Sequence, residues 1–431
     1  MSQQNARFNQ QNTRFNEQNT RYNAANAALG AVAMGLINQY VSIFAVRLGA
    51  DNLQLGYLSS WPQLVSVISV LVIAGSVAQS ANKQRLIGYI YLAGRAASLF
   101  AAAVPWLPER ARVWALIGSW VLYIFPTSAA ANAQNAFLAD VFPGSERARA
   151  FASRNSWSTA ASTATVLISG WLLDYLLPYP LGYQVMFVIS FAAALFEAYC
   201  FFRLKEAPDA AAQEPAKERP GLKTYSQTLS HKPFRNFLLL SIPFHFTWQM
   251  AWPIFTRYQV TDLGATNTWL SYISVAQSLS MIAVFPWWAR MAEKRGNHLM
   301  LGLAAINLAT APGLTAAAAN IKLQVLLNLW TGIGVAGVSL LVLNRQLEVS
   351  PAEGRPVFLA VHSALVAVSA AIAPIAGAFL MDSMPTRWAL MLCTGFRTLT
   401  ALSFFVTGWL ATRRKGKSVA VEKSSTANAA L

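Results

Sequence analysis

The sequence is poor in charged residues and in cysteine for its length. Only 12% of its 431 residues are charged, whereas 55% are hydrophobic. A soluble domain of this length needs more polar surface than such a composition supplies, so lipid must cover much of the chain. The two cysteines, Cys200 and Cys393, each lie in an apolar run, and we expect neither a disulfide framework nor a cysteine metal site.

Motifs for metal, nucleotide or covalent chemistry are also missing. The four histidines are scattered and show no ligand spacing such as His-Glu-x-x-His, so no metal site is predicted. A Gly-x4-Gly-Lys-Ser/Thr loop is absent, which argues against ATP as an energy source within this chain. We therefore expect no catalytic residue, no cofactor and no enzyme activity.

Long apolar runs are what the chain has in abundance. A bilayer core of roughly 30 Å needs about 20 apolar residues per helical span, and twelve runs of that length are present. The runs are continuously apolar, whereas the strands of a membrane barrel would alternate, so the predicted fold class is an all-α integral membrane protein. The expected spans are 24–46, 53–77, 86–107, 113–138, 156–177, 183–203, 234–256, 268–290, 297–318, 321–344, 357–381 and 387–411.

Lysine and arginine gather in alternate loops between these spans. Short loops rich in these residues stay in the cytoplasm, so both termini are expected on the cytoplasmic side of a bacterial inner (plasma) membrane. The net charge of +16 is thus mainly a topology signal, and nucleic-acid binding is disfavoured because the basic residues form no continuous patch. The residues that set this orientation are Arg7, Arg14, Arg21, Lys83, Arg85, Arg147, Arg149, Arg154, Lys294, Arg295, Arg355, Arg413, Arg414, Lys415 and Lys417.

The polar start of the chain, residues 1–23, repeats with a period of seven. Phe8, Phe15 and Tyr22, each preceded by an arginine, would form a thin aromatic stripe on a helix. Two interpretations stay open: a helix that lies in the membrane interface, or a disordered tail enlarged by repeat duplication. One apolar position per heptad is too few for a coiled coil.

Two patterns occur once in each half of the chain. Residues 48–59 return with seven identities as residues 263–274. The pattern Asp140-x-x-Pro-x-x-x-Arg147 is answered by Glu348-x-x-Pro-x-x-x-Arg355, at the predicted cytoplasmic ends of the fourth and tenth spans. The proline helps to stop the helix and leaves the acid and the arginine free to pair with each other or with a neighbouring loop. A duplicated unit is therefore predicted, and these residues either gate the cytoplasmic side or only orient loops at the lipid headgroups.

Together these patterns resemble the major facilitator superfamily, whose members have two six-helix bundles and an acid-x6-Arg element after helices 4 and 10. The family also has a loop of the type Gly-x-x-x-Asp-Arg-x-Gly-Arg. Here its first copy, residues 75–85, carries Gln79 and Ser80 in place of the acid and first base, whereas the second, residues 289–297, keeps Glu293 and Lys294.

The resemblance implies twelve transmembrane helices in two pseudo-symmetric bundles, and it adds Lys83, Arg85, Glu293 and Lys294 to the candidate cytoplasmic gate. The expected domains are a polar tail (1–23), a first six-helix bundle (24–204), a cytoplasmic linker (205–233), a second six-helix bundle (234–411) and a basic tail (412–431).

The resemblance also implies alternating access around a central site lined by helices 1, 4, 7 and 10, with a small molecule as substrate. Helix 7 is the richest in polar and aromatic residues, and their spacing predicts one shared face. Amides and rings suit a neutral, amphipathic or aromatic solute, or a sugar; each amide could instead hold helices together, and each tryptophan could anchor the interface. The substrate-binding candidates are Asn38, Gln39, Asn132, Gln134, Asn135, His245, Trp248, Gln249, Trp252 and Asn328.

Three charged residues lie well away from the ends of predicted spans, where a charge is costly unless it is paired or hydrated. Helices 3 and 6 belong to the same half in this family, so Arg95 and Glu197 are predicted to form a structural pair; alternatively, Glu197 carries protons. Arg397 either faces the cavity and binds an anion or bonds backbone carbonyls in its own half. His245 is a further candidate for ion coupling because of its pKa range.

The predicted function is a secondary active transporter that moves a small organic solute across the lipid bilayer, coupled to H+ or Na+, and we expect a monomer. The alternative is a non-transporting membrane receptor or assembly factor with the same fold.

Overall fold

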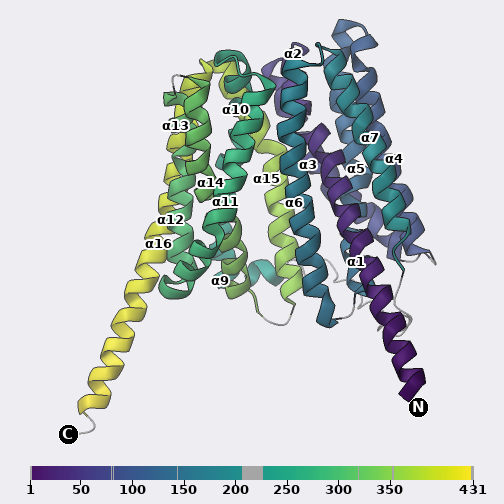
Figure 1. Ribbon diagram of the computed structural model, residues 1–431. Coiled ribbons are helices and arrows are strands. Elements are labelled where there is room, and N and C mark those ends of the chain that lie inside the picture. The colour runs from purple at the N-terminus through teal and green to yellow at the C-terminus, as the bar shows by residue number, and fades with distance from the viewer. Residues whose placement is uncertain are drawn as a thin grey trace. The chain divides into compact units, whose positions relative to one another are not determined.

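The computed structural model describes the backbone of residues 2–78, 80, 82–142, 144–205, 227–318, 320–351 and 354–428. Throughout this part of the chain every regular element is a helix (Figure 1). The chain divides into two units, one of residues 1–218 with 266–271 and one of residues 219–265 with 272–431. The predicted linker 205–233 lies mostly outside the described residues.

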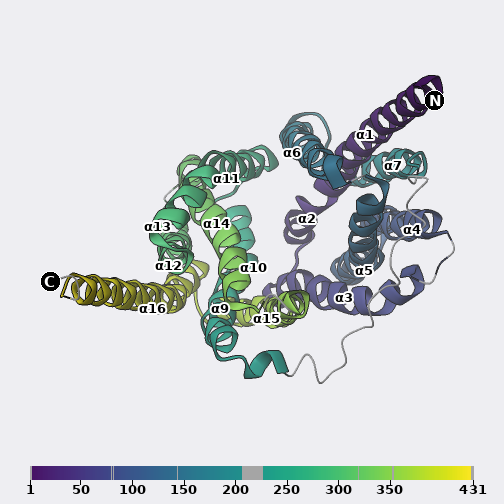
Figure 2. The ribbon, with the colours of Figure 1, turned by 90° about the horizontal axis from the view of Figure 1, so that it is seen from below.

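In the first unit, long helices lie side by side. Helix α1 packs against α6 and α7, α4 packs against α5 and α7, and α3 packs against α5, as the end-on view of this unit in Figure 2 shows. The elements are α1 (Ser2–Asn38), α2 (Val41–Arg47), α3 (Asn52–Ala78), α4 (Lys83–Ala103), a short 3-10 turn (Val104–Trp106), α5 (Glu109–Val141), α6 (Gly144–Tyr175) and α7 (Leu181–Phe202).

In the second unit, α12 packs against α14 and α16, and α9 packs against α15 and α16. One apolar core, centred on residues such as Phe244, Leu301 and Phe404, is shared by these helices. The elements are α9 (Lys232–Met250), α10 (Trp252–Arg257), a π-helical turn (Tyr258–Asp262), α11 (Asn267–Arg295), α12 (Asn297–Ala309), α13 (Ala311–Ala317), α14 (Ile321–Val349), α15 (Arg355–Ser383) and α16 (Thr386–Asn428). The predicted tail from residue 412 thus continues α16.

Each predicted span corresponds to one of these helices or to two consecutive ones. Over the described residues, nine helical stretches are long and apolar enough to cross a membrane. Helices α3, α6 and α9 are not among them. The all-helical membrane fold is therefore confirmed, and nine of the twelve spans meet the criterion of length and composition.

The twelve-residue repeat has a structural explanation. Gly49 and Gly264 occupy matching positions in its two copies, and both have a positive φ, of 88° and 61°. Such a conformation is strained for residues with a Cβ, so glycine at these positions ends one helix and lets the chain turn. The next helices begin at Asn52 and Asn267, again at matching positions. The repeat therefore marks, in each half of the chain, the end of one helix and the beginning of the next.

The starts of α1 and α6 bear on two expectations. The structure favours the helical one of the two interpretations of the polar start, because α1 begins at Ser2, and Asn19 and Tyr22 contact the rest of the first unit. The side chains of Phe8 and Phe15 lie outside the described residues. Arg154 is not in a loop, because α6 begins at Gly144 and carries Arg154 in its third turn. An apolar run alone predicted the start of this helix too late.

Candidate functional site

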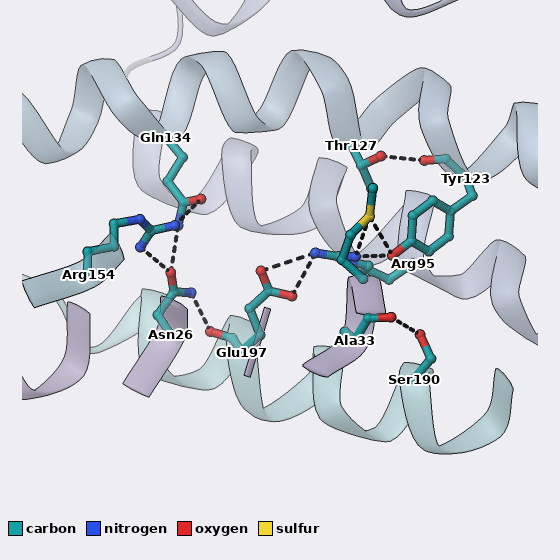
Figure 3. Close-up of polar contacts among 10 residues, drawn as sticks. Asn26, Ala33, Arg95, Tyr123, Thr127, Gln134, Arg154, Ser190 and Glu197 are labelled. Atoms are coloured by element: carbon teal, nitrogen blue, oxygen red, sulfur yellow. Dashed lines mark hydrogen bonds and ion pairs between the residues drawn. The ribbon is translucent and has the colours of Figure 1, made fainter. Parts of the chain in front are cut away.

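A polar network inside the first unit joins the helices α1, α4, α5, α6 and α7 (Figure 3). Its hub is Arg154 of α6, whose Nη1 donates to Oδ1 of Asn23 (3.1 Å) and of Asn26 (2.9 Å), and whose Nη2 donates to Oε1 of Gln134 (3.2 Å). Gln134 of α5 also donates from Nε2 to Oδ1 of Asn26 (2.8 Å). The amide oxygens of α1 and α5 are thus turned toward a single guanidinium group.

Asn26 connects this hub to a buried ion pair. Its Nδ2 donates to the backbone oxygen of Glu197 in α7 (2.9 Å), and Oε2 of Glu197 lies 3.3 Å from Nη2 of Arg95 in α4. The side chains of Arg95 and Glu197 are only 6% and 8% exposed. Arg95 also donates from Nη1 to the hydroxyl of Tyr123 in α5. The structure therefore brings Arg95 and Glu197 together, as the sequence predicted, and mutual neutralisation offsets the cost of burying both charges.

Gly30 on α1 makes room for this carboxylate. A Cβ at position 30 would overlap Oε1 of Glu197, so only glycine lets the carboxylate lie against the helix backbone. The sequence offers no reason to single out this glycine, because its partner is 167 positions away along the chain.

A hollow of about 280 Å³ adjoins the network, and we call it the α1–α6 hollow. Arg154, Ser158 and Ser162 line it from α6, and Arg95 and Glu197 reach it from α4 and α7. The α1 side is formed chiefly by small residues, which are Ala27, Gly30, Ala31 and Gly35. Charged and hydroxyl groups thus border a space inside an otherwise apolar bundle.

The predicted candidates of α1 and α5 are only partly brought together here. Asn38 lines the α1–α6 hollow, and Gln134 belongs to the network. Asn132 and Asn135 are exposed, and Asn132 donates to Ser128 of its own helix (2.9 Å). Gln39 is half-buried and lies at the end of α1.

In the second unit, the predicted face of α9 is interrupted. The helix ends at Met250, and Trp252 begins α10 after the single residue Ala251. Three of the four predicted residues thus lie on α9, and a face shared by all four stays a prediction. His245 and Trp248 do lie together, with ring centroids 5.9 Å apart. Gln249 is buried and directs Nε2 toward the backbone oxygen of Val366 (3.5 Å).

His245 has a histidine neighbour that sequence reasoning missed. Its Nδ1 lies 2.8 Å from the backbone oxygen of Ser241, and the hydroxyl of Ser241 lies 2.9 Å from Nε2 of His362 on α15. The two imidazole rings are 5.7 Å apart. Asn328 of α14, by contrast, donates within its own helix to Gln324 (2.9 Å).

Arg397 of α16 takes the second of its two predicted roles. It is 0% exposed, and it donates to the backbone oxygens of Leu308 (3.2 Å), Thr247 (3.3 Å) and Trp248 (3.0 Å). These carbonyls belong to the last turns of α12 and α9, where the regular i to i+4 hydrogen bonds of a helix come to an end. Pro312, four residues after Leu308, has no N–H to offer. Arg397 therefore satisfies acceptors released by two helix breaks.

The candidate gate residues lie at helix ends. Lys83, Arg85, Arg147, Glu293 and Lys294 are exposed, and the side chain of Asp140 lies outside the described residues. Glu348 of α14 pairs with Arg345 (2.9 Å) and accepts from Nδ2 of Asn297 at the start of α12. Within the described part of the chain it makes no ion pair with Arg355, so the acid pairs with an arginine of its own helix and bonds the start of α12 rather than pairing with the arginine of its own pattern.

Long apolar helices with charged side chains buried between them define a multi-pass membrane protein. The chain belongs to the Major Facilitator Superfamily, because the model of that family matches residues 24–244 and 237–430.

Solved structures with a similar fold are transporters. They include the nucleoside transporter NupG, with 13% identity and a TM-score of 0.68 over 91% of this chain and 98% of that chain. A bacterial homolog to the human lysosomal transporter Spinster has 11% identity and a TM-score of 0.66 over 93% of this chain and 97% of that one. A D-xylose-proton symporter has 12% identity and a TM-score of 0.64 over 90% and 96%. At such identities the likeness concerns the fold alone.

Among curated proteins, an uncharacterized MFS-type transporter of Schizosaccharomyces pombe is 26% identical over 147 residues. The match covers 34% of this chain and 24% of that protein, so the chain spans about a quarter of the length of this relative.

Proposed function

We propose that this chain is a secondary active transporter that moves a small organic solute across a membrane by alternating access. The observation that carries the proposal is the α1–α6 hollow, where Arg154, Ser158 and Ser162 border a space inside an apolar bundle. Charged groups inside membrane helices are costly and typically mark solute or ion pathways. Membership of a transporter superfamily supports the same function.

The coupling ion, H+ or Na+, is proposed to act through His245 rather than through Glu197 or Arg397. Glu197 is held by Arg95, and Arg397 is held by three carbonyls. His245 lies beside Ser241 and His362, so a proton gained by one ring has hydroxyl and imidazole neighbours. An imidazole ring can take up a proton on one nitrogen and release it again, which suits a proton carrier.

The candidate gate residues at the helix ends are proposed to gate the cytoplasmic side, and they are Lys83, Arg85, Asp140, Arg147, Glu293, Lys294, Glu348 and Arg355. This assignment rests on the orientation set by the lysines and arginines, with both termini in the cytoplasm of a bacterial cell. Reporter fusions at the two ends test it: cytoplasmic activity at both supports the orientation, and external activity at either contradicts it.

Transport itself is tested in liposomes that contain the purified full-length protein. A panel of sugars, nucleosides, amino acids and organic acids is offered with and without gradients of H+ and Na+. We expect saturable uptake of at least one solute above the level of protein-free liposomes. Absence of flux for the whole panel by folded protein would contradict the proposal and would favour a receptor or assembly factor.

A further inference from the structure

The α1–α6 hollow carries an unbalanced positive charge. Its charged lining residues are Arg95 from α4, Arg154 from α6 and Glu197 from α7. The side chains of α1 at this site are uncharged, and α5 supplies the neutral groups of Gln134 and Tyr123 to the network. Tyr91 of α4 is the remaining titratable side chain in the lining.

The single carboxylate of the hollow, that of Glu197, forms an ion pair with Arg95. Nη2 of Arg95 lies 3.4 Å from Oε1 and 3.3 Å from Oε2 of Glu197, so both oxygens face the same nitrogen. The backbone of Gly30 lies against the other side of the carboxylate, where a Cβ would overlap it. Glu197 therefore neutralises Arg95, and within the described part of the chain no carboxylate forms an ion pair with Arg154.

The contacts of Arg154 orient its guanidinium group without neutralising it. All three acceptors, on Asn23, Asn26 and Gln134, are neutral amide oxygens. These bonds use both hydrogens of Nη1 and one of Nη2, whereas a guanidinium group has five N–H donors. One N–H on Nε and one on Nη2 are not used by these three bonds, and a carboxylate can accept from such a fork of adjacent nitrogens with its two oxygens.

The rest of the hollow continues from this fork along one face of α6. Arg154, Ser158 and Ser162 are spaced by four residues, so they form one stripe of a guanidinium and two hydroxyl groups. Ala27, Ala31 and Gly35 of α1 also border the hollow, where their small side chains leave room for a solute. At about 280 Å³ the space lies just below the usual range for drug-sized ligands, which favours a small solute.

We propose that the α1–α6 hollow binds a small organic monocarboxylate, whose carboxylate pairs with Arg154 while its body lies along Ser158 and Ser162. One negative charge leaves the hollow electrically neutral, whereas a neutral solute leaves Arg154 unpaired, and a dianion adds an excess charge in a low-dielectric region. This assignment deepens the proposed transport function and rests on it, because it names the class of solute carried.

The test compares acids with amides of the same shape. Full-length protein in lipid nanodiscs is titrated with lactate, benzoate and nicotinate, and with lactamide, benzamide and nicotinamide, while tryptophan fluorescence and calorimetry report binding. We expect saturable binding of at least one acid, and at least tenfold weaker binding of its amide. This comparison uses the unaltered chain, so it does not depend on any variant folding. Equal binding of acid and amide, or absence of binding by all three acids, overturns the proposal.

Variants then locate the binding group. Arg154→Gln is expected to weaken binding of the acid at least tenfold, and Arg154→Lys to restore part of it. Arg149→Gln, which removes an exposed arginine of the same helix, is the matched control and should bind like the unaltered chain. Ser158→Leu fills the hollow without removing any bond of Arg154 and should also abolish binding. Unchanged binding in both Arg154→Gln and Ser158→Leu overturns the assignment.

The outcome is separable from that of the transport assay. If the liposome panel shows saturable flux of a neutral solute while no acid binds, the transport function stands and the carboxylate site is wrong. If an acid binds at Arg154 without flux, the site stands and the transport function is wrong.

Discussion

Arg154 in the first unit and Arg397 in the second are both arginines inside apolar helical bundles, yet their surroundings differ. Arg397 is fully enclosed and donates to backbone carbonyls at two helix breaks. Arg154 is half-buried, borders a hollow, and has neutral amide partners that hold it in place. An arginine in a membrane helix is therefore not by itself evidence of a binding site. Its hydrogen-bond acceptors and its access to a cavity distinguish a binding role from a structural one.

The largest effect on stability is expected from Arg397→Met. The carbonyls of Thr247 and Trp248 lose the donor that Arg397 supplies, and that of Leu308 loses one of two donors. Since each orphaned acceptor costs roughly 1–3 kcal/mol, we expect a loss of about 4 kcal/mol in the free energy of unfolding. Thermal unfolding in nanodiscs measures it. Arg387→Met, at an exposed position of the same helix, is the control and should change little. A melting temperature equal to that of the unaltered chain would show that the carbonyls do not need Arg397.

A smaller effect is expected from Glu197→Gln, because it leaves the buried Arg95 without a counter-ion. Breaking one partner of a buried ion pair costs about 3–5 kcal/mol, of which we expect the lower end because Tyr123 still binds Arg95. Adding Arg95→Gln should recover part of the loss, as thermal unfolding of the single and double variants would show. Losses that simply add in the double variant would argue against a pair.

Gly30→Ala tests the close contact between α1 and the carboxylate of Glu197, and we expect it to lower stability less than Glu197→Gln does. The new methyl group overlaps the carboxylate of Glu197 and forces it away from Arg95, so we expect a loss of about 2 kcal/mol, typical of overpacking. Gly118→Ala is the control, because a Cβ added at this position of α5 would meet no other atom within 4 Å. The control should be neutral or slightly stabilising, since alanine favours a helix more than glycine does. Equal melting temperatures of the two variants would contradict the close approach.

The smallest effect on stability is expected from His245→Gln, which keeps a hydrogen-bond donor near Ser241. We expect this variant to lose proton coupling instead. In liposomes, a proton gradient should no longer accelerate uptake, while uptake down the gradient of the solute continues. His298→Gln, a histidine at the start of α12 that bonds Thr407, serves as the control. A full response to the gradient in His245→Gln would place ion coupling elsewhere.

The sequence predicted the helices well and the polar network poorly. Apolar runs of about 20 residues are a direct signal for spans, and Arg95 and Glu197 attract notice because charge is rare within such runs. Asn23 and Asn26 escaped notice because they adjoin a polar tail, and Arg154 because it resembles a loop residue. The hydrogen bonds between these residues and Gln134 form only because α1, α5 and α6 lie together, and no local sequence pattern shows this.

In the second unit, the sequence did not reveal a helix break and a contact between two histidines. The spacing of His245, Trp248, Gln249 and Trp252 predicted one face of a single helix, but the structure has two helices here, and Trp252 belongs to the second. Trp248 packs against the apolar core, which is where a large ring adds the most stability. His362 lies 117 positions from His245, so only the packing of α15 on α9 brings the two together.

Transport through the α1–α6 hollow is best tested by uptake of a bound carboxylate into liposomes that contain either the unaltered chain or Ser158→Leu, with equal amounts of folded protein in both. We predict saturable, gradient-driven uptake by the unaltered chain and uptake near the protein-free level for Ser158→Leu, because leucine fills the hollow. Equal uptake by the two proteins would contradict a route through this site.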